Sequence, residues 1–455
     1  MKMYDWIQKS GRLEKIDECA AEYIDFLTAG KTERLCVKEI VKKAENKGFV
    51  EFNSVKKLEI GQKLYVNHKG KSVFLFVIGK KPLEEGLNIV GAHIDSPRLD
   101  LKGNPLYEDS NLALLKTHYY GGIKKYQWGC VPLALVGVVY TKDGKKVEIE
   151  IGLKDEDPVF CVNDLLIHLA AKQMQKKAAE VIEGEQLNIV FAHMPGEVKE
   201  NAEKSEAVKQ NVLKLLKDRY GIEEEDFISA EIEAVPAVKA KYVGIDKGLI
   251  GSYGQDDRIC SFTAMRAILD VDAPERTACV ILADKEEIGS VGNTGMNSLA
   301  LENVVSELID KEGEYSALKV RRALYNSKVL SSDVNAAFDP SFPDVMDKKN
   351  CSYIGQGIAL TKYTGSRGKS GSNDANAEFM YEVRKIFNDA DVLWQIGELG
   401  KVDEGGGGTI ACYLSHYGAE VVDCGPAVLN MHSPFELSSK VDVYSAYMAY
   451  NAFLK

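Results

Sequence analysis

Two adjacent glutamates, Glu286 and Glu287, follow the apolar run ACVILA in the stretch ACVILADKEEIGSVGNTG. Most Glu-Glu pairs lie on solvated helix faces. Here the preceding run is short, apolar and rich in β-branched residues, and glycines follow at 289, 292 and 295. That pattern predicts a buried strand that ends in a turn-rich loop. Ligands of open α/β sheets bind beyond the carboxyl ends of the strands, so the pair marks a candidate site.

Other histidines and carboxylates have the same position after a strand-like run. His93 and Asp95 stand two residues apart in LNIVGAHIDSPRLD, and residues two apart on a strand point to one face. Further examples are Asp256 and Asp257 in GSYGQDDR, Asp333 in KVLSSD, and His432 in AVLNMH. Carboxylates packed at the ends of neighbouring buried strands would repel one another and raise each other's pKa. A divalent metal removes that problem, and zinc accepts a mixed set of imidazole and carboxylate ligands.

Composition limits the class of protein. The chain has 455 residues, a formal net charge of -11 and a pI near 5.4, which argues against nucleic acid or an anionic membrane as partner. The first residues, MKMYDWIQKSGRLEK, contain no apolar signal region, and no stretch approaches the roughly 20 apolar residues that span a bilayer. The nine cysteines form no C-x-x-C pair and indicate thiols of a reducing compartment. We therefore expect a soluble, cytoplasmic protein.

The sequence pattern changes twice along the chain. Helical periodicity from about residue 12 to 47 is followed by strand-like runs up to residue 101. Residues 102–238 contain alternating β segments with an Asp-Gly hairpin signal in TKDGKK, an expected helix at 162–184 and a charged helix at 205–221. Strand-then-helix alternation resumes afterwards. We predict a catalytic α/β domain built from residues 1–101 and 239–455, interrupted by an inserted domain at 102–238.

The motifs GAHIDSPRLDLK, GQDDR, DKEEIGS, SSDVNAAFDP, GGGGTI and MHSPFELSSKVD make the chain similar to the aspartyl aminopeptidase family, which includes vacuolar aminopeptidase I. The resemblance covers nearly the whole chain. It implies a mixed-sheet α/β/α zinc-exopeptidase domain with an inserted, mostly β dimerisation domain. It also implies that His93, Asp256 and Asp333 hold one metal ion, while Asp256, Glu287 and His432 hold a second. Asp256 would bridge the two ions, which we expect to be zinc, with cobalt or manganese as alternatives.

The resemblance also assigns roles to residues that bind no metal. Asp95 would orient a metal ligand, and Glu286 would act as general base on the bridging water during removal of the N-terminal residue of a peptide. Lys362 would receive the carboxylate of an acidic N-terminal residue, and His168 would reach the active site of a neighbouring subunit in a homododecamer. The chain carries Ala336 and Asp339 where relatives often have histidines, so a preference for acidic residues does not transfer with the resemblance.

Two other functions remain open at this stage. The same metal set would serve a dinuclear carboxypeptidase or a deacylase that acts on another amide. A catalytically silent assembly subunit is the alternative from a different class, and the intact set of candidate ligands and base speaks against it. A nucleic-acid-binding module is disfavoured by the acidic charge and by the lack of a basic motif.

Overall fold

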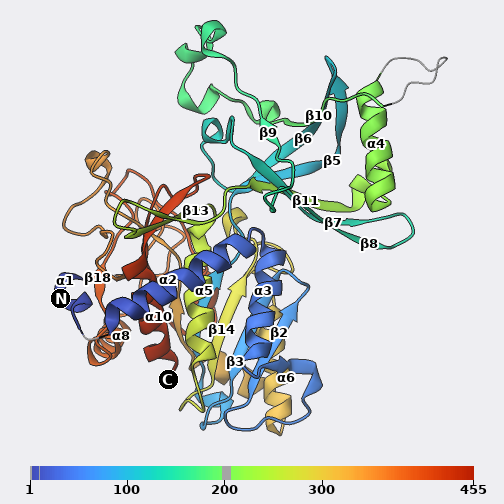
Figure 1. Cartoon of the computed structure of the whole chain (residues 1–455). Helices are drawn as coiled ribbons and strands as arrows, with labels where there is room; N and C mark the ends of the chain where they lie inside the picture. Colours follow the sequence, from blue (N-terminus) through green and yellow to red (C-terminus); the bar gives the residue numbers. More distant parts are fainter. Residues whose placement is uncertain (1–2, 10, 197–205) are drawn as a thin grey trace. The chain divides into compact units, whose positions relative to one another are not determined.

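The computed structural model describes residues 3–9, 11–196 and 206–455, and the chain folds into two compact units (Figure 1). The first unit is built from both ends of the chain, with residues 1–96, 240–431 and 435–455. The second unit comprises residues 97–239 together with the short segment 432–434.

A mixed sheet of nine strands forms the centre of the first unit, and its inner strands β14, β4, β15 and β19 run parallel to one another. From one edge to the other the strands are β1 (Val50–Glu51), β2 (Lys63–His68), β3 (Ser72–Val77), β14 (Ala278–Ala283), β4 (Asn88–His93), β15 (Lys328–Ser331), β19 (Glu420–Gly425), β17 (Ile358–Thr361) and β18 (Trp394–Ile396). Because parallel strands end at the same edge, the residues that follow β14, β4 and β15 meet there.

Alternating side chains of this sheet fill two apolar cores. Leu75 of β3 faces one core and its neighbour Phe74 faces the other, as the two-residue period of a strand requires. The first core receives α2 (Arg12–Ala29), α3 (Glu33–Asn46), α5 (Gln255–Leu269), α8 (Ala377–Asp389) and α10 (Lys440–Leu454), together with Trp6 of α1 (Met3–Ile7). The second receives α6 (Ala300–Glu312), α7 (Ala317–Tyr325) and α9 (Ala411–Ser415). The result is the predicted α/β/α arrangement.

A second sheet of five short strands belongs to the same unit. Its order is β12 (Lys241–Val243), β13 (Leu249–Ser252), β21 (Glu436–Ser439), β20 (Ala427–Leu429) and β16 (Asn335–Ala336). The parallel neighbours β15 and β19 of the large sheet continue into β16 and β20, which again pair in parallel. Asp333 therefore lies in the short link where the chain leaves one sheet and enters the other.

The second unit is mostly β, as expected. Its seven-stranded sheet has the order β8 (Lys146–Ile151), β7 (Leu133–Tyr140), β11 (Ala230–Pro236), β5 (Arg98–Asp109), β6 (Leu112–Tyr120), β10 (Ile189–Ala192) and β9 (Cys161–Val162). The predicted TKDGKK hairpin joins β7 to β8, and the charged segment forms helix α4 (Ala207–Tyr220).

The helix predicted over residues 162–184 is wrong. That segment forms short 3₁₀ turns, including η4 (Ile167–Leu169) and η5 (Gln173–Gln175). Its leucines are exposed, so a helix there would have no core on which to bury an apolar face. Polar side chains hold the turns instead: Asp164 accepts hydrogen bonds from the Leu165 N–H and from Gln173 Nε2.

Two observations concern the whole described chain. All nine cysteines are free thiols. Among residues 3–9, 11–196 and 206–455, no helix combines the length and the apolar character that crossing a membrane requires.

Candidate metal centre

His93 is the last residue of strand β4, and its imidazole is buried. Nδ1 lies 3.1 Å from the backbone carbonyl oxygen of Asp95 and 3.3 Å from Asp95 Oδ1. A carbonyl oxygen only accepts, so Nδ1 carries the proton and Nε2 is the atom that can bind a cation. Nε2 is directed at carboxylates, with Asp256 Oδ1 at 3.2 Å and Asp333 Oδ1 at 3.7 Å.

The glutamate pair follows strand β14, whose last residue Ala283 pairs with His93 across the parallel ladder. Lys285 adopts a left-handed conformation and starts the single turn η9 (Glu286–Ile288), which reverses the chain at the sheet edge. The buried carboxylate of Asp95 accepts the N–H of Glu286 and the N–H of Glu287, each at 3.2 Å. One acidic side chain therefore holds the backbone of both glutamates.

Asp256 follows a strand, as expected from the sequence, but this strand is not part of the nine-stranded sheet. The strand before it, β13, belongs to the five-stranded sheet, and Asp256 and Asp257 lie in the irregular first turn of α5. The peptide bond between these two residues is cis. His432 likewise follows β20 of the five-stranded sheet. The candidate site residues that follow strands therefore come from two different sheets.

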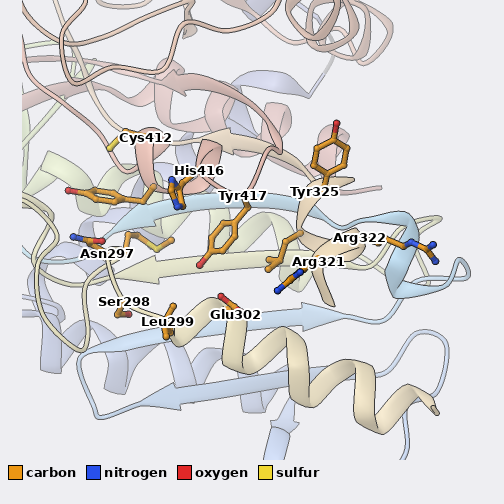
Figure 2. Close-up of a pocket in the computed structure, with 13 residues that line it drawn as sticks. Asn297, Ser298, Leu299, Glu302, Arg321, Arg322, Tyr325, Cys412, His416 and Tyr417 are labelled. Carbon is orange, nitrogen blue, oxygen red and sulfur yellow. The ribbon is translucent and has the colours of Figure 1, made fainter. Parts of the chain in front are cut away.

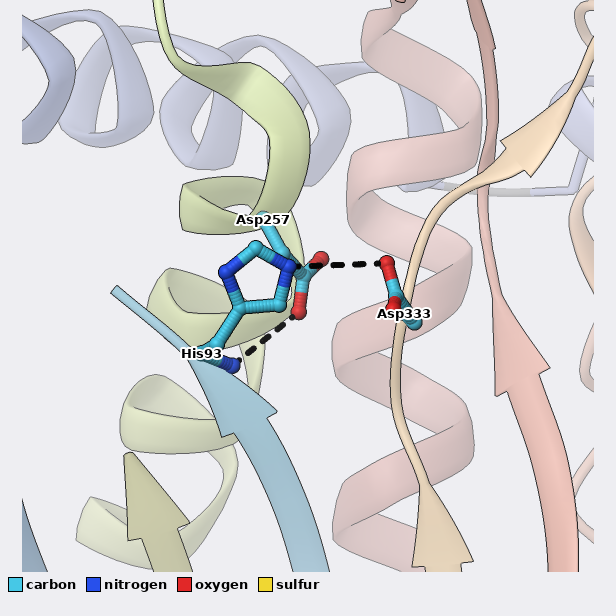
Figure 3. A group of neighbouring side chains, drawn as sticks. All are labelled: His93, Asp257 and Asp333. Carbon is cyan, nitrogen blue, oxygen red and sulfur yellow. Dashed lines mark hydrogen bonds and ion pairs between the residues drawn. The ribbon is translucent and has the colours of Figure 1, made fainter. Parts of the chain in front are cut away.

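Three of the other predicted metal ligands come together around His93. His93, Asp256 and Glu287 each offer a ligand atom within 4.8 Å of the others, and so do His93, Asp257 and Asp333 (Figure 3). Asp257 differs from its neighbour in that its Oδ2 accepts the backbone N–H of His93 at 3.4 Å. The geometry therefore combines one imidazole with several carboxylates in a small buried space, a donor set suited to a divalent cation.

The electrostatics of this space favour positive charge. Burial raises the pKa of Glu286 to about 8, with His93 opposing the rise and Asp333, Asp95 and Asp256 adding to it. Burial also raises the pKa of Asp333, against a hydrogen bond from His93 that lowers it. For His93, burial alone would lower the pKa, but hydrogen bonds to Asp256, Asp333 and Asp95 raise it well above its ordinary value. A cation among these groups would relieve the same repulsion.

The fifth predicted ligand, His432, lies in the segment that groups with the second unit. Its Nδ1 lies 2.7 Å from the carbonyl oxygen of Gly122, so Nδ1 donates and Nε2 is again the atom that can coordinate. Neither of the two clusters around His93 includes His432.

The two predicted substrate residues lie outside these clusters. Lys362 Nζ forms an ion pair with Asp374 Oδ1 at 2.6 Å, and Lys369 binds the other oxygen of Asp374 at 2.8 Å. His168 is exposed in the turn η4 of the second unit.

Sequence reasoning missed two buried carboxylates near the predicted ligands. Glu436 of β21 accepts the backbone N–H of Gln255 and that of Asp256. Asp423 of β19 accepts a hydrogen bond of 2.6 Å from Thr409 Oγ1, just after the glycine run 405–408. Glu436 lies inside the motif MHSPFELSSKVD, but its neighbours gave no sign that it contacts α5.

A surface cavity of about 970 Å³ lies elsewhere on the first unit, between α7, α9 and the segment that leads into α6 (Figure 2). Figure 2 shows His416, Tyr417 and Glu302 around it. None of the residues around His93 lines this cavity. Tyr413 lines the cavity, and its hydroxyl donates a hydrogen bond of 2.8 Å to the carbonyl oxygen of Gly289, the residue that follows the turn η9.

Comparison with known proteins gives consistent matches along the whole chain. Residues 26–454 match the family described as aminopeptidase I zinc metalloprotease (M18). A probable M18 family aminopeptidase 1 of Clostridium acetobutylicum is 52% identical over 447 residues, which cover 97% of this chain and 96% of the relative. The crystal structure of an M18 family aminopeptidase from Thermotoga maritima matches with a TM-score of 0.95 and 46% identity, covering 100% and 99% of the two chains. The mApe1 dodecamer of S. cerevisiae shares the fold, with a TM-score of 0.77, 23% identity and 97% of each chain covered.

We expect Gly425→Ala to weaken binding of zinc by the purified protein. Gly425 ends β19, and a Cβ there would lie 1.8 Å from the carbonyl oxygen of Asp333, so the link that carries Asp333 must shift. Overpacking of this kind costs about 1–3 kcal/mol of unfolding free energy. The measurements are thermal unfolding and zinc titration. Gly368→Ala, where a Cβ meets nothing within 4 Å, is the control. Unchanged zinc affinity in Gly425→Ala would contradict the placement of Asp333 in the site.

Proposed function

The chain belongs to the aminopeptidase I zinc metalloprotease family (M18), and from this membership we propose how its residues remove N-terminal residues from peptides. Two divalent ions, zinc in our proposal, bind to His93, Asp256, Glu287, Asp333 and His432. The observation that carries the proposal is that the ligand atoms of His93, Asp256 and Glu287 lie within 4.8 Å of one another, and so do those of His93, Asp257 and Asp333. Cobalt and manganese bind the same donor types, so metal analysis of the purified protein tests the choice of zinc.

We assign His93, Asp256 and Asp333 to one ion, and Asp256, Glu287 and His432 to the other, with Asp256 shared. The distance of 3.2 Å from His93 Nε2 supports Asp256 as the shared ligand. Its neighbour Asp257 receives the His93 backbone N–H and so has a positioning contact of its own. The Nδ1 hydrogen bonds of both histidines support coordination through Nε2.

Metal ions in such a site lower the pKa of a water molecule and polarise the scissile carbonyl group. With metal bound, Glu286 would accept a proton from the attacking water and donate it to the departing amine. The position of Glu286 supports the role, because its Oε2 lies 3.8 Å from His93 Nε2, beside the proposed ligand atoms. The carboxylate of Asp95 accepts the backbone N–H of Glu286 and so positions that residue. The backbone carbonyl oxygen of Asp95 accepts a hydrogen bond from His93 Nδ1.

We expect Glu286→Gln to keep its metal content and lose turnover by about 10²- to 10⁴-fold, because the amide cannot accept a proton. Glu287→Ala should lose metal, since it removes a ligand. Metal analysis and hydrolysis of aminoacyl substrates measure the two effects. N-acetylated peptides serve as the control substrate and should stay intact, because an aminopeptidase needs a free amine. Full turnover by Glu286→Gln would refute the assignment of the base.

For the substrate, we propose that Lys362 binds the side-chain carboxylate of an acidic N-terminal residue in competition with Asp374. Lys362 and Lys369 both pair with Asp374, so a substrate carboxylate must replace a contact that already exists. Both partners in the Lys362 pair are about half exposed, and exposed pairs contribute about 0.2–1 kcal/mol. The preference for acidic residues that follows is therefore weak.

We expect Asp374→Asn to raise kcat/KM for N-terminal Glu over N-terminal Leu by up to about fivefold, the factor that corresponds to about 1 kcal/mol. The substitution removes the competing charge and leaves Lys362 available. Lys362→Met should lower the same ratio. Lys385→Met is the matched control, because Lys385 forms a comparable exposed ion pair with Asp389 on α8. Equal ratios in all four proteins would exclude Lys362 from the substrate site.

We propose further that the second unit mediates assembly, and that the assembly is a dodecamer in which His168 reaches the active site of a neighbouring subunit. Leu165, Leu166, Ile167 and Leu169 surround His168 and are 47–70% exposed. A contiguous apolar segment of this kind is typical of a protein–protein contact. The yeast protein mApe1, which shares the fold, forms a dodecamer and supports the same assembly.

We also propose that the protein is located in the cytoplasm, which its nine free thiols support.

We expect the double substitution Ile167→Glu and Leu169→Glu to shift the protein to smaller species, because two charges would have to be buried in the contact. Sedimentation velocity measures the distribution of species. Ile245→Glu is the control, since Ile245 is an exposed apolar residue too but lies on the first unit. An unchanged distribution in the double variant would place the assembly contact elsewhere.

A further inference from the structure

Glu436 is a buried carboxylate that touches the backbone of a proposed metal ligand. It is the first residue of β21 and pairs with Ser252, the last residue of β13. Its side chain is 1% exposed. Oε2 accepts the N–H of Gln255 at 2.6 Å and the N–H of Asp256 at 3.2 Å. Both donors belong to the first turn of α5, where N–H groups have no partner within the helix.

The turn that Glu436 holds is irregular, so the helix itself does not fix it. Asp256 has φ -79° and ψ 106°, and Asp257 has φ -118° and ψ 37°, both outside the helical range. Gly254 precedes them in a left-handed conformation and offers no side chain as a cap. The orientation of the Asp256 side chain therefore depends on contacts from outside the helix, and Glu436 supplies two of them.

Gln255 ties the same strand to the same turn a second time. Its Nε2 donates to the carbonyl oxygen of Glu436 at 2.7 Å and to that of Ile250 at 3.1 Å. Its Oε1 accepts from the hydroxyl groups of Ser438 and Tyr23. The side chain is buried with all of these contacts, so the α5 turn is held to β21 and β13 by a continuous set of hydrogen bonds.

We propose that Glu436 is a positioning residue of the metal centre, one that sets the backbone of Asp256 so that its carboxylate lies where a shared ligand must lie. This inference rests on the proposed assignment of Asp256 as the bridging ligand. A carboxylate suits the task better than a neutral acceptor, because hydrogen bonds from N–H groups to an ionised oxygen are shorter and stronger. Contacts of this kind around metal ligands typically change metal affinity by 10- to 100-fold when they are removed.

Asp442 of α10 provides a matched comparison within the same unit. It is fully buried and accepts two backbone N–H groups, from Gly355 and from Gly357, each at 2.7 Å. The turn that it holds leads into β17 and carries no proposed ligand. Removing either carboxylate takes away two charge-assisted hydrogen bonds from buried backbone, but only Glu436 acts on a proposed ligand.

The test compares Glu436→Leu, Glu436→Gln, Asp442→Asn and Asp256→Ala as full-length proteins stripped of metal and titrated with zinc alone. We expect Glu436→Leu to raise the zinc Kd by 10- to 100-fold and Glu436→Gln by less than tenfold, because the amide oxygen still accepts. Asp442→Asn should lower the unfolding temperature and leave the zinc Kd within twofold. The absorption spectrum after refilling with cobalt gives a second readout, which should change shape in Asp256→Ala and in both Glu436 variants, and stay unchanged in Asp442→Asn.

The outcomes separate the two proposals. If Asp256→Ala binds zinc as the unaltered chain does, the ligand assignment fails. If Asp256→Ala loses zinc while Glu436→Leu keeps its affinity and cobalt spectrum, Glu436 is a purely structural cap and only the present inference is overturned. If Glu436→Leu does not fold, Glu436→Gln decides: a zinc Kd and cobalt spectrum equal to those of the unaltered chain overturn the inference, and a raised Kd sustains it.

Discussion

The structure depends on keeping negative charge buried at one edge of a parallel sheet. Strands β4, β14 and β15 are neighbours and run in one direction, so His93, the Glu286–Glu287 pair and Asp333 are delivered to the same place by the register of the ladder. Burying a carboxylate is costly unless it is paired or hydrogen-bonded. Burial accordingly raises the pKa of Glu286 and of Asp333. A divalent cation offsets that cost, which links the stability of this edge to the metal chemistry of the family.

Hydrogen bonds from backbone N–H groups stabilise several of the buried carboxylates. Asp95, Glu436 and Asp442 each accept two of them, and each holds a stretch of irregular backbone. Such stretches lack the repeating hydrogen bonds of a helix or strand, and their N–H groups need other partners. A buried carboxylate serves two donors at once and gains charge-assisted bonds in return. Two of the three turns fixed in this way carry the proposed ligands Glu287 and Asp256.

The sequence predicted the α/β fold and the candidate residues that follow strands of the large sheet. His93, Glu287 and Asp333 could be placed at one sheet edge because apolar runs in the sequence form β4, β14 and β15, and a turn or a polar residue follows each strand. Asp256 could be named but not placed, because β13 has only four residues, LIGS, and its partner β21 is remote in the sequence. The helix over 162–184 failed because periodicity does not reveal whether a core is present to receive the apolar face. The Lys362–Asp374 pair depends on loop conformation, which local patterning does not specify.

The proposed ligands come from segments that follow strands of both sheets. At Asp333 the chain passes from the large sheet into the small one. Asp333 lies between β15 of the large sheet and β16 of the small one, and Pro426 lies between β19 and β20 in the adjacent, parallel crossing. The Asn335 N–H donates to the Pro426 carbonyl oxygen at 2.9 Å, which ties the two crossings together. Glu436 on β21 of the small sheet then fixes the turn that carries Asp256. The hydrogen bonds at the crossings and at Glu436 therefore join the small sheet to the segments that carry Asp333 and Asp256.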